Sequence, residues 1–418
     1  MISLEPKKFA GCVEIPASKS QTIRALLIAA AANGESIIRH PLFSSDTCSA
    51  LDAVKALGAE ITISPDNTII YVKSKGLHAK EGTTIDAGNS GTTLYLLLPM
   101  LGTLKDSVII TGDEQLRKRP TAPLVNALSA LGAECTDTEG KPPVKIKGPI
   151  RSGNAVIECR TSQYLSGLLL AAPLSAGHTT IDCPVLFEKP YVTLTLRWLD
   201  KQGIEYKISD DYMHAEVDGG QSYKPFDEYI AGDFSSASFF FVAAAISGTS
   251  ITVKGLDRDD PQGDKEILRI LEKMGASIEW NGNAVTVTGP EKLSGGEFDL
   301  NAIPDTLPIL SIAAAAAVGD THLTNVPQAR IKETDRIKCM HDNLVRLGVE
   351  TEEESDGLLI HGTGKINGGE VKGYGDHRII MSMAIASAKA DSPIIIDDES
   401  QAAVTFPTFF EILDSIRR

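Results

Sequence analysis

Residues 16–24, PASKSQTIR, place hydroxyl groups, a lysine and an arginine in front of an apolar segment, ALLIAAAA, at residues 25–32. We expect the apolar segment to be a helix that Ser18 or Ser20 caps. The unpaired N–H groups of its first turn carry partial positive charge, and Lys19 and Arg24 add two full charges. The pattern predicts an anion site at the start of a helix, although a single example is more often an ordinary capped helix with solvated basic residues.

The same arrangement recurs along the chain as a polar capping cluster, a small-residue apolar helix and a β-branched strand. The copies begin near residues 18, 88, 161, 233, 305 and 376. Because these segments are apolar on nearly all sides, we expect the helices to be buried. If the buried helices of one domain run parallel, their positive N-terminal ends face the same way. A substrate that carries two or three negative charges is therefore indicated.

A second repeated phrase ends a helix and opens a strand. It reads ALGAEI, ALGAEC, KQGIEY, KMGASI and RLGVET, with its glycines at positions 58, 132, 203, 275 and 348. We expect each glycine to end a helix in the left-handed conformation. The spacing of about 72 residues indicates a repeated βαβαββ-like supersecondary unit that is used six times.

The repeats predict two domains, because 418 residues exceed one typical hydrophobic core. Five units are complete, and the sixth lacks the strands that should follow a helix in residues 406–418. We expect residues 1–4 and 11–15 to supply those strands. This places both termini in a first domain of residues 1–17 and 231–418, and residues 18–230 in a second domain, with three units in each. The active site is expected in the cleft between them.

The composition limits the partners of the chain. A net charge of -15 and a pI of about 5.1 argue against nucleic acid or an anionic membrane surface. They allow a small anionic substrate, because salt screens exposed charges beyond about 8–10 Å. The six cysteines have no metal-site spacing, the N-terminus lacks a signal-peptide core, and the alanine-rich runs are too short to span a membrane. We therefore expect a cytoplasmic protein with reduced thiols and no bound metal.

Eight motifs together resemble the signatures of the 5-enolpyruvylshikimate-3-phosphate synthases in order and spacing. They are PASKSQTIRALL, DAGNSGTT, GDEQLRKRP, TSQYLSGLLLAAPL, KPYV, DFSSASFF, RIKETDR and GDHRIIMSMAIA, and they cover essentially the whole chain. The resemblance implies a two-domain inside-out α/β barrel with buried parallel helices. It also implies transfer of the enolpyruvyl group of phosphoenolpyruvate to the 5-hydroxyl of shikimate 3-phosphate, with release of phosphate. No cofactor is implied, and we expect a monomer.

This chemistry requires cations for two phosphorylated carboxylates, and positioned groups that give and take protons. The resemblance implies three acid/base candidates, which are Asp305, Glu333 and Lys19. It implies shikimate 3-phosphate contacts from Lys19, Ser20, Arg24, Thr161, Ser162, Gln163, Asp305 and Lys332. It implies phosphoenolpyruvate contacts from Lys19, Asn89, Gly91, Arg119, Gln163, Arg336 and Arg378. Gly91 also matches the glycine whose replacement by alanine makes relatives insensitive to glyphosate, a competitor of phosphoenolpyruvate.

The chain departs from the family pattern at four positions. They are Tyr95 in place of an arginine, Glu188 in place of a phosphate-binding serine, Gln328 in place of an asparagine, and Val404 in place of a lysine. Glu188 is the most consequential, because a carboxylate repels a phosphate unless a cation such as Lys189 or Arg197 lies between them.

Two other functions fit parts of the sequence. A UDP-N-acetylglucosamine enolpyruvyl transferase would share the fold and the donor, but it usually has a reactive cysteine in the loop that reads GDEQLRKR at residues 112–119 here. A non-catalytic anion-binding relative is compatible with the four departures. Phosphate release only when both substrates are present would separate the enzyme from that relative.

Overall fold

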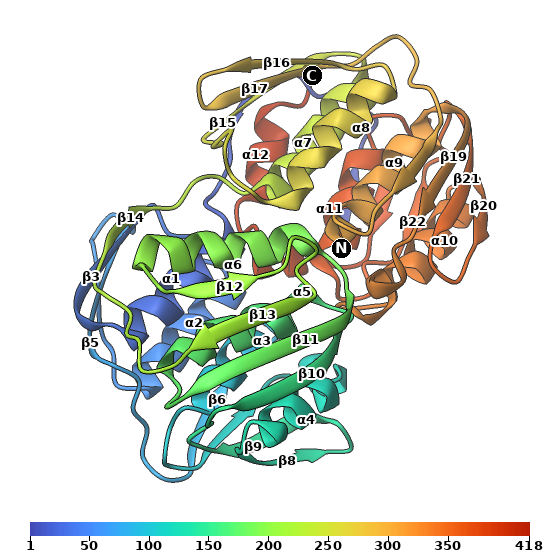
Figure 1. The fold of residues 1–418 in the computed structure, drawn as a ribbon. Coiled ribbons are helices and arrows are strands. Elements are labelled where there is room, and N and C mark those ends of the chain that lie inside the picture. The colour runs from blue at the N-terminus through green and yellow to red at the C-terminus, as the bar shows by residue number, and fades with distance from the viewer. The chain divides into compact units, whose positions relative to one another are not determined.

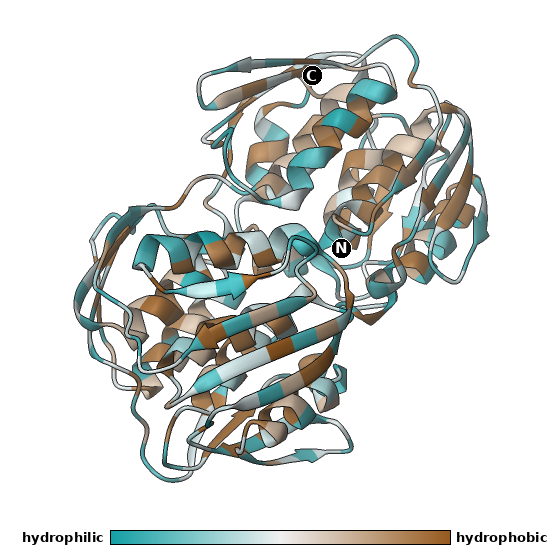
Figure 2. Cartoon of the chain, in the orientation of Figure 1, coloured by the Kyte–Doolittle hydropathy of each residue, from teal (hydrophilic) through white to brown (hydrophobic).

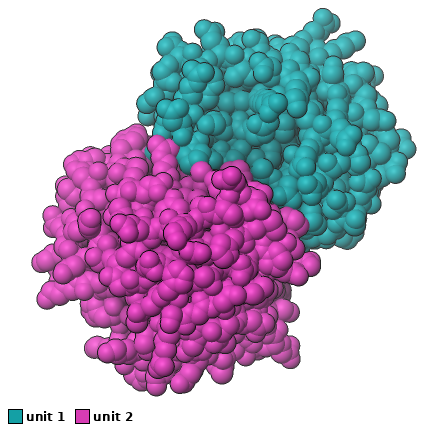
Figure 3. Space-filling model, viewed as in Figure 1, with its two compact units in different colours: residues 1–16, 231–418 teal, residues 17–230 magenta.

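The computed structural model describes residues 1–418 and divides them into two compact units (Figures 1 and 3). Unit 1 contains residues 1–16 and 231–418, and unit 2 contains residues 17–230. Each unit encloses its own hydrophobic core. No helix is long and apolar enough to cross a membrane.

Each unit is built around three helices that are almost completely buried. In unit 2 they are α1 (Lys19–Ala31), α3 (Gly91–Leu101) and α5 (Ser162–Ala171). In unit 1 they are α7 (Phe234–Ser247), α9 (Leu307–Ala316) and α11 (His377–Ala386). All residues of α7, α9 and α11 are buried, as the all-round apolar sequence predicts. The fold class expected from the sequence is confirmed.

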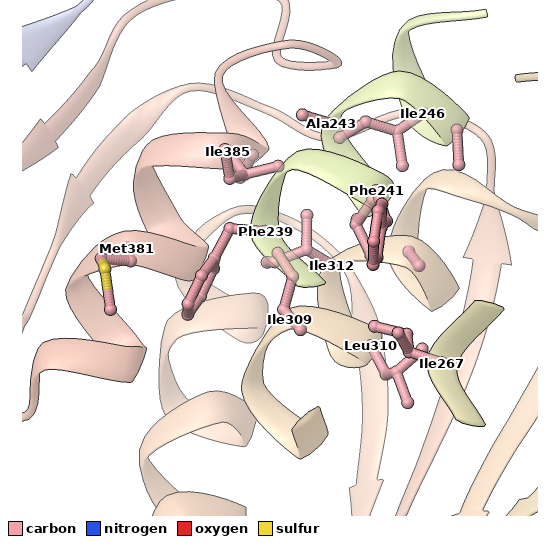
Figure 4. Close-up of a cluster of buried hydrophobic side chains, with 14 of the residues drawn as sticks. Phe239, Phe241, Ala243, Ile246, Ile267, Ile309, Leu310, Ile312, Met381 and Ile385 are labelled. Carbon is pink, nitrogen blue, oxygen red and sulfur yellow. The ribbon is translucent and has the colours of Figure 1, made fainter. Parts of the chain in front are cut away.

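The inner helices of unit 1 pack through large apolar side chains. Figure 4 shows Phe239 and Phe241 of α7 among residues of the neighbouring helices. In unit 2, α3 and α5 approach each other closely at one glycine. A Cβ atom on Gly167 would lie 2.3 Å from the carbonyl oxygen of Tyr95. Only glycine permits this approach of one helix to the backbone of the other.

A second set of six helices completes the repeats, and the first five of them end near the repeated glycines. In unit 2 these are α2 (Ser45–Ala56), α4 (Ala122–Ala130) and α6 (Lys189–Gln202). In unit 1 they are α8 (Ile267–Lys273), α10 (Arg336–Arg346) and α12 (Phe409–Ser415). Short 3-10 helices cover Leu116–Lys118, Ala172–Leu174, Gly263–Glu266, Pro304–Thr306, Pro327–Ile331 and Ser400–Val404.

Unit 2 has three four-stranded sheets, whose alternating hydropathy is visible in Figure 2. The first contains β14 (Asp227–Tyr229), β3 (Asn33–Arg39), β5 (Ile69–Lys75) and β4 (Glu60–Ile63). The second contains β6 (Thr83–Asp86), β7 (Val108–Thr111), β9 (Lys141–Lys147) and β8 (Glu134–Thr138). The third contains β10 (Gly153–Cys159), β11 (His178–Leu186), β13 (His214–Asp218) and β12 (Tyr206–Ile208).

Unit 1 repeats this plan with two four-stranded sheets and one three-stranded sheet. The first contains β16 (Ser277–Asn281), β17 (Ala284–Thr288), β15 (Ser250–Lys254) and β2 (Gly11–Glu14). The second contains β18 (Glu297–Asp299), β19 (Val318–Thr324), β21 (Leu358–Thr363) and β20 (Glu350–Glu353). The third contains β1 (Ile2–Leu4), β23 (Ile394–Ile396) and β22 (Gly369–Val371).

The N-terminal strands correct one prediction from the sequence. β1 pairs with β23 in the sixth repeat, as expected, but β2 pairs with β15 in the fourth repeat. In every repeat the strand after the inner helix takes a parallel partner on one edge. The strand that precedes α7 in sequence, β14, remains in unit 2 beside β3, so β2 takes the vacant position beside β15. Each crossover segment therefore completes a sheet of the unit that the chain is leaving.

Candidate active site

In unit 1, the predicted residues meet where two inner helices and one outer helix begin. Asp305 lies in the 3-10 turn before α9, Glu333 in the loop before α10, and Arg378 in the first turn of α11. The side chains of Asp305 and Arg378 are in contact, so α9 and α11 begin at the same end of the unit. This agrees with the parallel inner helices expected from the sequence.

Arg336, the first residue of α10, connects the carboxylates of this cluster. Its side chain is 1% exposed. Nη1 donates to Asp305 Oδ1 at 2.8 Å, Nη2 to Glu333 Oε2 at 2.5 Å, and Nε to Asp376 Oδ2 at 2.9 Å. Burial lowers the pKa of Arg336, but attraction to these three carboxylates outweighs burial and raises it. The guanidinium therefore stays charged and fixes the spacing of the two acid/base candidates.

Asp305 is surrounded by cations. Besides Arg336, it accepts from Arg378 Nη2 at 3.0 Å, and Lys332 Nζ lies 3.9 Å from Oδ1. Burial raises the pKa of Asp305, but Arg378, Lys332 and Arg336 together hold it well below its ordinary value. Asp305 is therefore a carboxylate, and a proton acceptor, at neutral pH. It does not cap α9, whose N-cap residue is Thr306.

Asp376 belongs to this cluster, although the sequence shows it only as a helix cap. It is fully buried and accepts from Arg336, from the Thr334 hydroxyl at 3.0 Å, and from the backbone N–H of Arg378 at 2.8 Å. Burial raises the pKa of Asp376, but the charge of Arg336 and the hydrogen bonds that Asp376 accepts act against burial, and the pKa lies below its ordinary value. The available sequence signal for Asp376 was its position as the first residue of the sixth polar capping cluster. Three carboxylates thus face three cations, Lys332, Arg336 and Arg378.

Asp264 extends the cluster toward the start of α7. It is fully buried, and the Ser235 hydroxyl donates to it. Burial and the charge of Asp305 raise the pKa of Asp264 to about 6. The sequence pattern gave no reason to select this residue, because its neighbours are acidic residues typical of a solvated loop.

In unit 2, the start of α1 carries the first predicted group. Ser18, rather than Ser20, caps the helix by accepting from the Gln21 N–H. Lys19 Nζ lies 3.0 Å from Asp46 Oδ2, and its side chain is 14% exposed. Arg24 is buried deeper: Nε donates to Thr195 Oγ1 at 2.9 Å and Nη2 to the Tyr191 carbonyl at 3.2 Å. In this structure Arg24 joins α1 to α6, and Lys19 is the more accessible cation. Ser20 is half-buried, and its carbonyl accepts from Arg24 Nη1 at 3.0 Å.

The start of α3 carries the second group. Arg119 Nη2 donates to Asn89 Oδ1 at 3.2 Å, and Asn89 Nδ2 donates to Asp113 and Gln115 at 2.7 Å each. A Cβ atom on Gly91 would lie 2.3 Å from Arg119 Nη1. Asn89, Gly91 and Arg119 are therefore brought together, as the predicted phosphoenolpyruvate site requires.

The start of α5 carries the third group. Thr161 caps the helix, and Gln163 Nε2 donates to Thr92 Oγ1 of α3 at 3.3 Å, so α3 and α5 begin at the same end. The fully buried Ser162 donates to Glu188 Oε2 from its hydroxyl at 2.9 Å and from its backbone N–H at 3.2 Å. The carboxylate of Glu188 therefore lies among the groups predicted to contact shikimate 3-phosphate.

The other three departures from the family pattern have separate surroundings. Tyr95 and Tyr164 both donate to the Pro120 carbonyl, at 3.0 and 2.8 Å, beside Arg119. Gln328 donates to the Asn301 carbonyl at 2.9 Å. Val404 ends a 3-10 helix. Tyr95 thus supports the backbone next to a predicted cation instead of supplying a charge itself.

The chain is similar to known proteins over almost its whole length. The family model described as EPSP synthase (3-phosphoshikimate 1-carboxyvinyltransferase) matches residues 4–413. A 3-phosphoshikimate 1-carboxyvinyltransferase of Acetivibrio thermocellus is 45% identical over 99% of this chain and 97% of its own length. One of Ruminiclostridium cellulolyticum is 42% identical over 99% and 98%. The solved EPSP synthase from Acinetobacter baumannii superposes with a TM-score of 0.83 at 30% identity, over 99% of this chain and 98% of that one.

Proposed function

The chain belongs to the EPSP synthase family, and on that basis we propose that Asp305, Glu333 and Lys19 carry out the proton transfers of its reaction. The enzyme transfers the enolpyruvyl group of phosphoenolpyruvate to the 5-hydroxyl of shikimate 3-phosphate and releases phosphate. The observation that supports the assignment most strongly is that Arg336 holds Asp305 and Glu333 on neighbouring nitrogens of one buried guanidinium.

The two substrates bring phosphate and carboxylate groups, and the proposed contacts are divided between the two units. Shikimate 3-phosphate is assigned to Lys19, Ser20, Arg24, Thr161, Ser162, Gln163, Asp305 and Lys332. Phosphoenolpyruvate is assigned to Lys19, Asn89, Gly91, Arg119, Gln163, Arg336 and Arg378. Arginine is suited to this role because its planar fork binds carboxylate and phosphate oxygens in pairs.

Substrate binding would raise the pKa of Asp305. The cations that keep its pKa low, Lys332, Arg336 and Arg378, are also assigned to substrate anions. A substrate phosphate or carboxylate that takes over part of their charge weakens their hold on Asp305, and its pKa rises. The carboxylate thereby becomes a stronger base only when substrates are present.

The reaction then needs two proton transfers in the addition step and two in the elimination step. Asp305 takes the proton of the 5-hydroxyl as that oxygen attacks C2 of phosphoenolpyruvate. Glu333 or Lys19 gives a proton to the methylene carbon, which becomes the methyl group of a tetrahedral intermediate. The group that gave this proton then takes back a methyl proton as the double bond re-forms, and phosphate leaves with the proton that Asp305 held. The arginines stabilise the charge that moves onto phosphate.

An assay of phosphate release tests this function directly. Phosphoenolpyruvate with shikimate 3-phosphate should give phosphate and the enolpyruvyl product without added metal, and neither substrate alone should release phosphate. UDP-N-acetylglucosamine serves as the competing acceptor. Turnover with the UDP-sugar and none with shikimate 3-phosphate would reject the assignment.

We further propose that the enzyme acts as a monomer in the cytoplasm. All six cysteines are free thiols. They include Cys159 and Cys183, whose sulfur atoms lie 3.6 Å apart without a disulfide bond. Free thiols fit a reducing compartment. Light scattering coupled to size exclusion would show a mass near 44.6 kDa for a monomer.

A further inference from the structure

Glu188 places a negative charge where a substrate anion is expected. Glu188 is 2% exposed, and one of its carboxylate oxygens, Oε2, accepts three hydrogen bonds. The donors are the Ser162 hydroxyl at 2.9 Å, the Ser162 N–H at 3.2 Å and the Thr161 hydroxyl at 3.3 Å. We propose that Glu188 is an internal competitor for the phosphate group of shikimate 3-phosphate and that it sets the affinity for this substrate. The inference rests on the proposed function, which assigns Thr161 and Ser162 to shikimate 3-phosphate.

The three donors form an arrangement suited to an anionic oxygen. Two hydroxyls and the first N–H of α5 converge on one point, where the helix dipole adds partial positive charge. A phosphate oxygen and the Glu188 oxygen cannot both occupy that point. Two anions a few ångströms apart in a buried site also repel strongly. Shikimate 3-phosphate must therefore displace the Glu188 oxygen before one of its own oxygens can accept from these donors.

The backbone of Glu188 holds the side chain in this position. The residue has φ 58° and ψ 39°, a left-handed conformation that is uncommon for residues other than glycine, asparagine and aspartate. It directly precedes α6, yet its side chain makes no capping bond to that helix and turns to the start of α5. An unfavourable backbone conformation that directs a buried carboxylate to another helix is consistent with a functional constraint.

Two substitutions test the competition. Glu188→Gln keeps the shape and an acceptor oxygen but removes the charge. Glu188→Ser also removes the part of the side chain that reaches the three donors. We expect the Kd and KM of shikimate 3-phosphate to fall about tenfold in Glu188→Gln, with an equal or larger fall in Glu188→Ser. The KM of phosphoenolpyruvate should change less, because Asn89, Gly91 and Arg119, which are assigned to it alone, meet at the start of α3.

A matched control is Glu266→Gln, because Glu266 also precedes a helix, α8, but its side chain is 45% exposed and lies in unit 1. Glu266→Gln should leave the Kd and KM of shikimate 3-phosphate and the KM of phosphoenolpyruvate unchanged. Calorimetry with shikimate 3-phosphate measures binding without turnover, and thermal unfolding confirms that each variant is folded. Unchanged or weaker binding by a folded Glu188→Gln variant would overturn the inference and leave the proposed function intact if the wild type turns over. A wild type that neither binds nor converts shikimate 3-phosphate would overturn both.

Discussion

At the scale of single residues, Arg336 determines how the two acid/base candidates can act. One buried guanidinium binds Asp305, Glu333 and Asp376. Removing one partner of such a buried set leaves an uncompensated charge, so these carboxylates also contribute to stability. Tests of catalysis must therefore use substitutions that keep the shape and the hydrogen bonds.

Asp305→Asn and Glu333→Gln meet that condition. Each removes a proton acceptor or donor but retains an oxygen that can accept from Arg336. We expect each to lower kcat by about 10²–10⁴-fold, with a much smaller effect on the Kd of shikimate 3-phosphate. Glu291→Gln, at an exposed residue of unit 1, is the control. Near-normal kcat in both variants would show that other groups transfer the protons.

Gly91→Ala tests the position of Arg119. The added methyl carbon would lie 2.3 Å from Arg119 Nη1, the mobile end of a long side chain, so the guanidinium should shift rather than the backbone. We expect the KM of phosphoenolpyruvate to rise about tenfold, the loss of roughly one charge-assisted contact. Gly153→Ala is the control, because its Cβ atom would meet Leu131 at an ordinary 3.4 Å. An unchanged KM would mean that Arg119 does not bind phosphoenolpyruvate from this position.

The sequence indicated most of the charged residues of the cluster but not their pairing. Asp305, Glu333 and Arg378 could be selected because the family resemblance gives them roles. Asp376 lies in the same motif as Arg378 but looks like a helix cap, and Asp264 looks like a solvated acid. Which carboxylate meets which cation depends on contacts between residues as far apart as 305 and 378. Such contacts are set by packing of the helices and have no local sequence signal.

At the scale of elements, the sequence predicted where helices end, but it did not predict which strands pair. The five repeated glycines have positive φ, at 90°, 94°, 67°, 109° and 72° for positions 58, 132, 203, 275 and 348, as predicted. A helix end of this kind is determined by one residue that tolerates the left-handed conformation. The partner of β2 was predicted wrongly because alternation in a strand identifies its buried face but not the sheet that it joins.

Two histidines in the sheets, one in each unit, predict a pH-dependent contribution of the sheets to stability. His214 of β13 lies 2.7 Å from Asp182 of β11, and His361 of β21 lies 2.8 Å from Asp320 of β19. Glu216 and Glu352, respectively, lie on the other ring nitrogen. Hydrogen bonds to these carboxylates, above all to Asp182 and Asp320, raise the pKa of both histidines.

A raised histidine pKa stabilises the folded chain while the imidazole is protonated. The contribution is complete below the unfolded pKa of about 6.5 and is lost as pH rises through the higher folded pKa. We expect the double variant His214→Gln, His361→Gln to lower Tm at about pH 6 and to have little effect at about pH 9. His78→Gln, whose ring contacts the Gly76 carbonyl, is the control. An equal loss of Tm at both pH values would show that only packing was removed.

At the scale of the whole molecule, the proposed contacts are divided between two units that two chain segments connect, at residues 16–17 and 230–231. Lys19, Arg119 and Ser162 belong to unit 2, and the Arg336 cluster belongs to unit 1. Neither unit has a full set of the residues assigned to either substrate. Each unit also has its own core and could hold its own part of the site in place.

A ligand assigned to residues of both units should change their arrangement. Its affinity is highest for conformations in which both sets of residues reach it, so binding shifts the population toward those conformations. Removal of water around the transferred group would strengthen the electrostatic interactions there. We expect small-angle scattering to give a smaller radius of gyration with shikimate 3-phosphate plus glyphosate than without ligand. Arg378→Ala, which removes one of the cations that unit 1 contributes, should reduce the change. An unchanged radius, with binding shown by calorimetry on the same sample, would mean that ligands bind without rearranging the units.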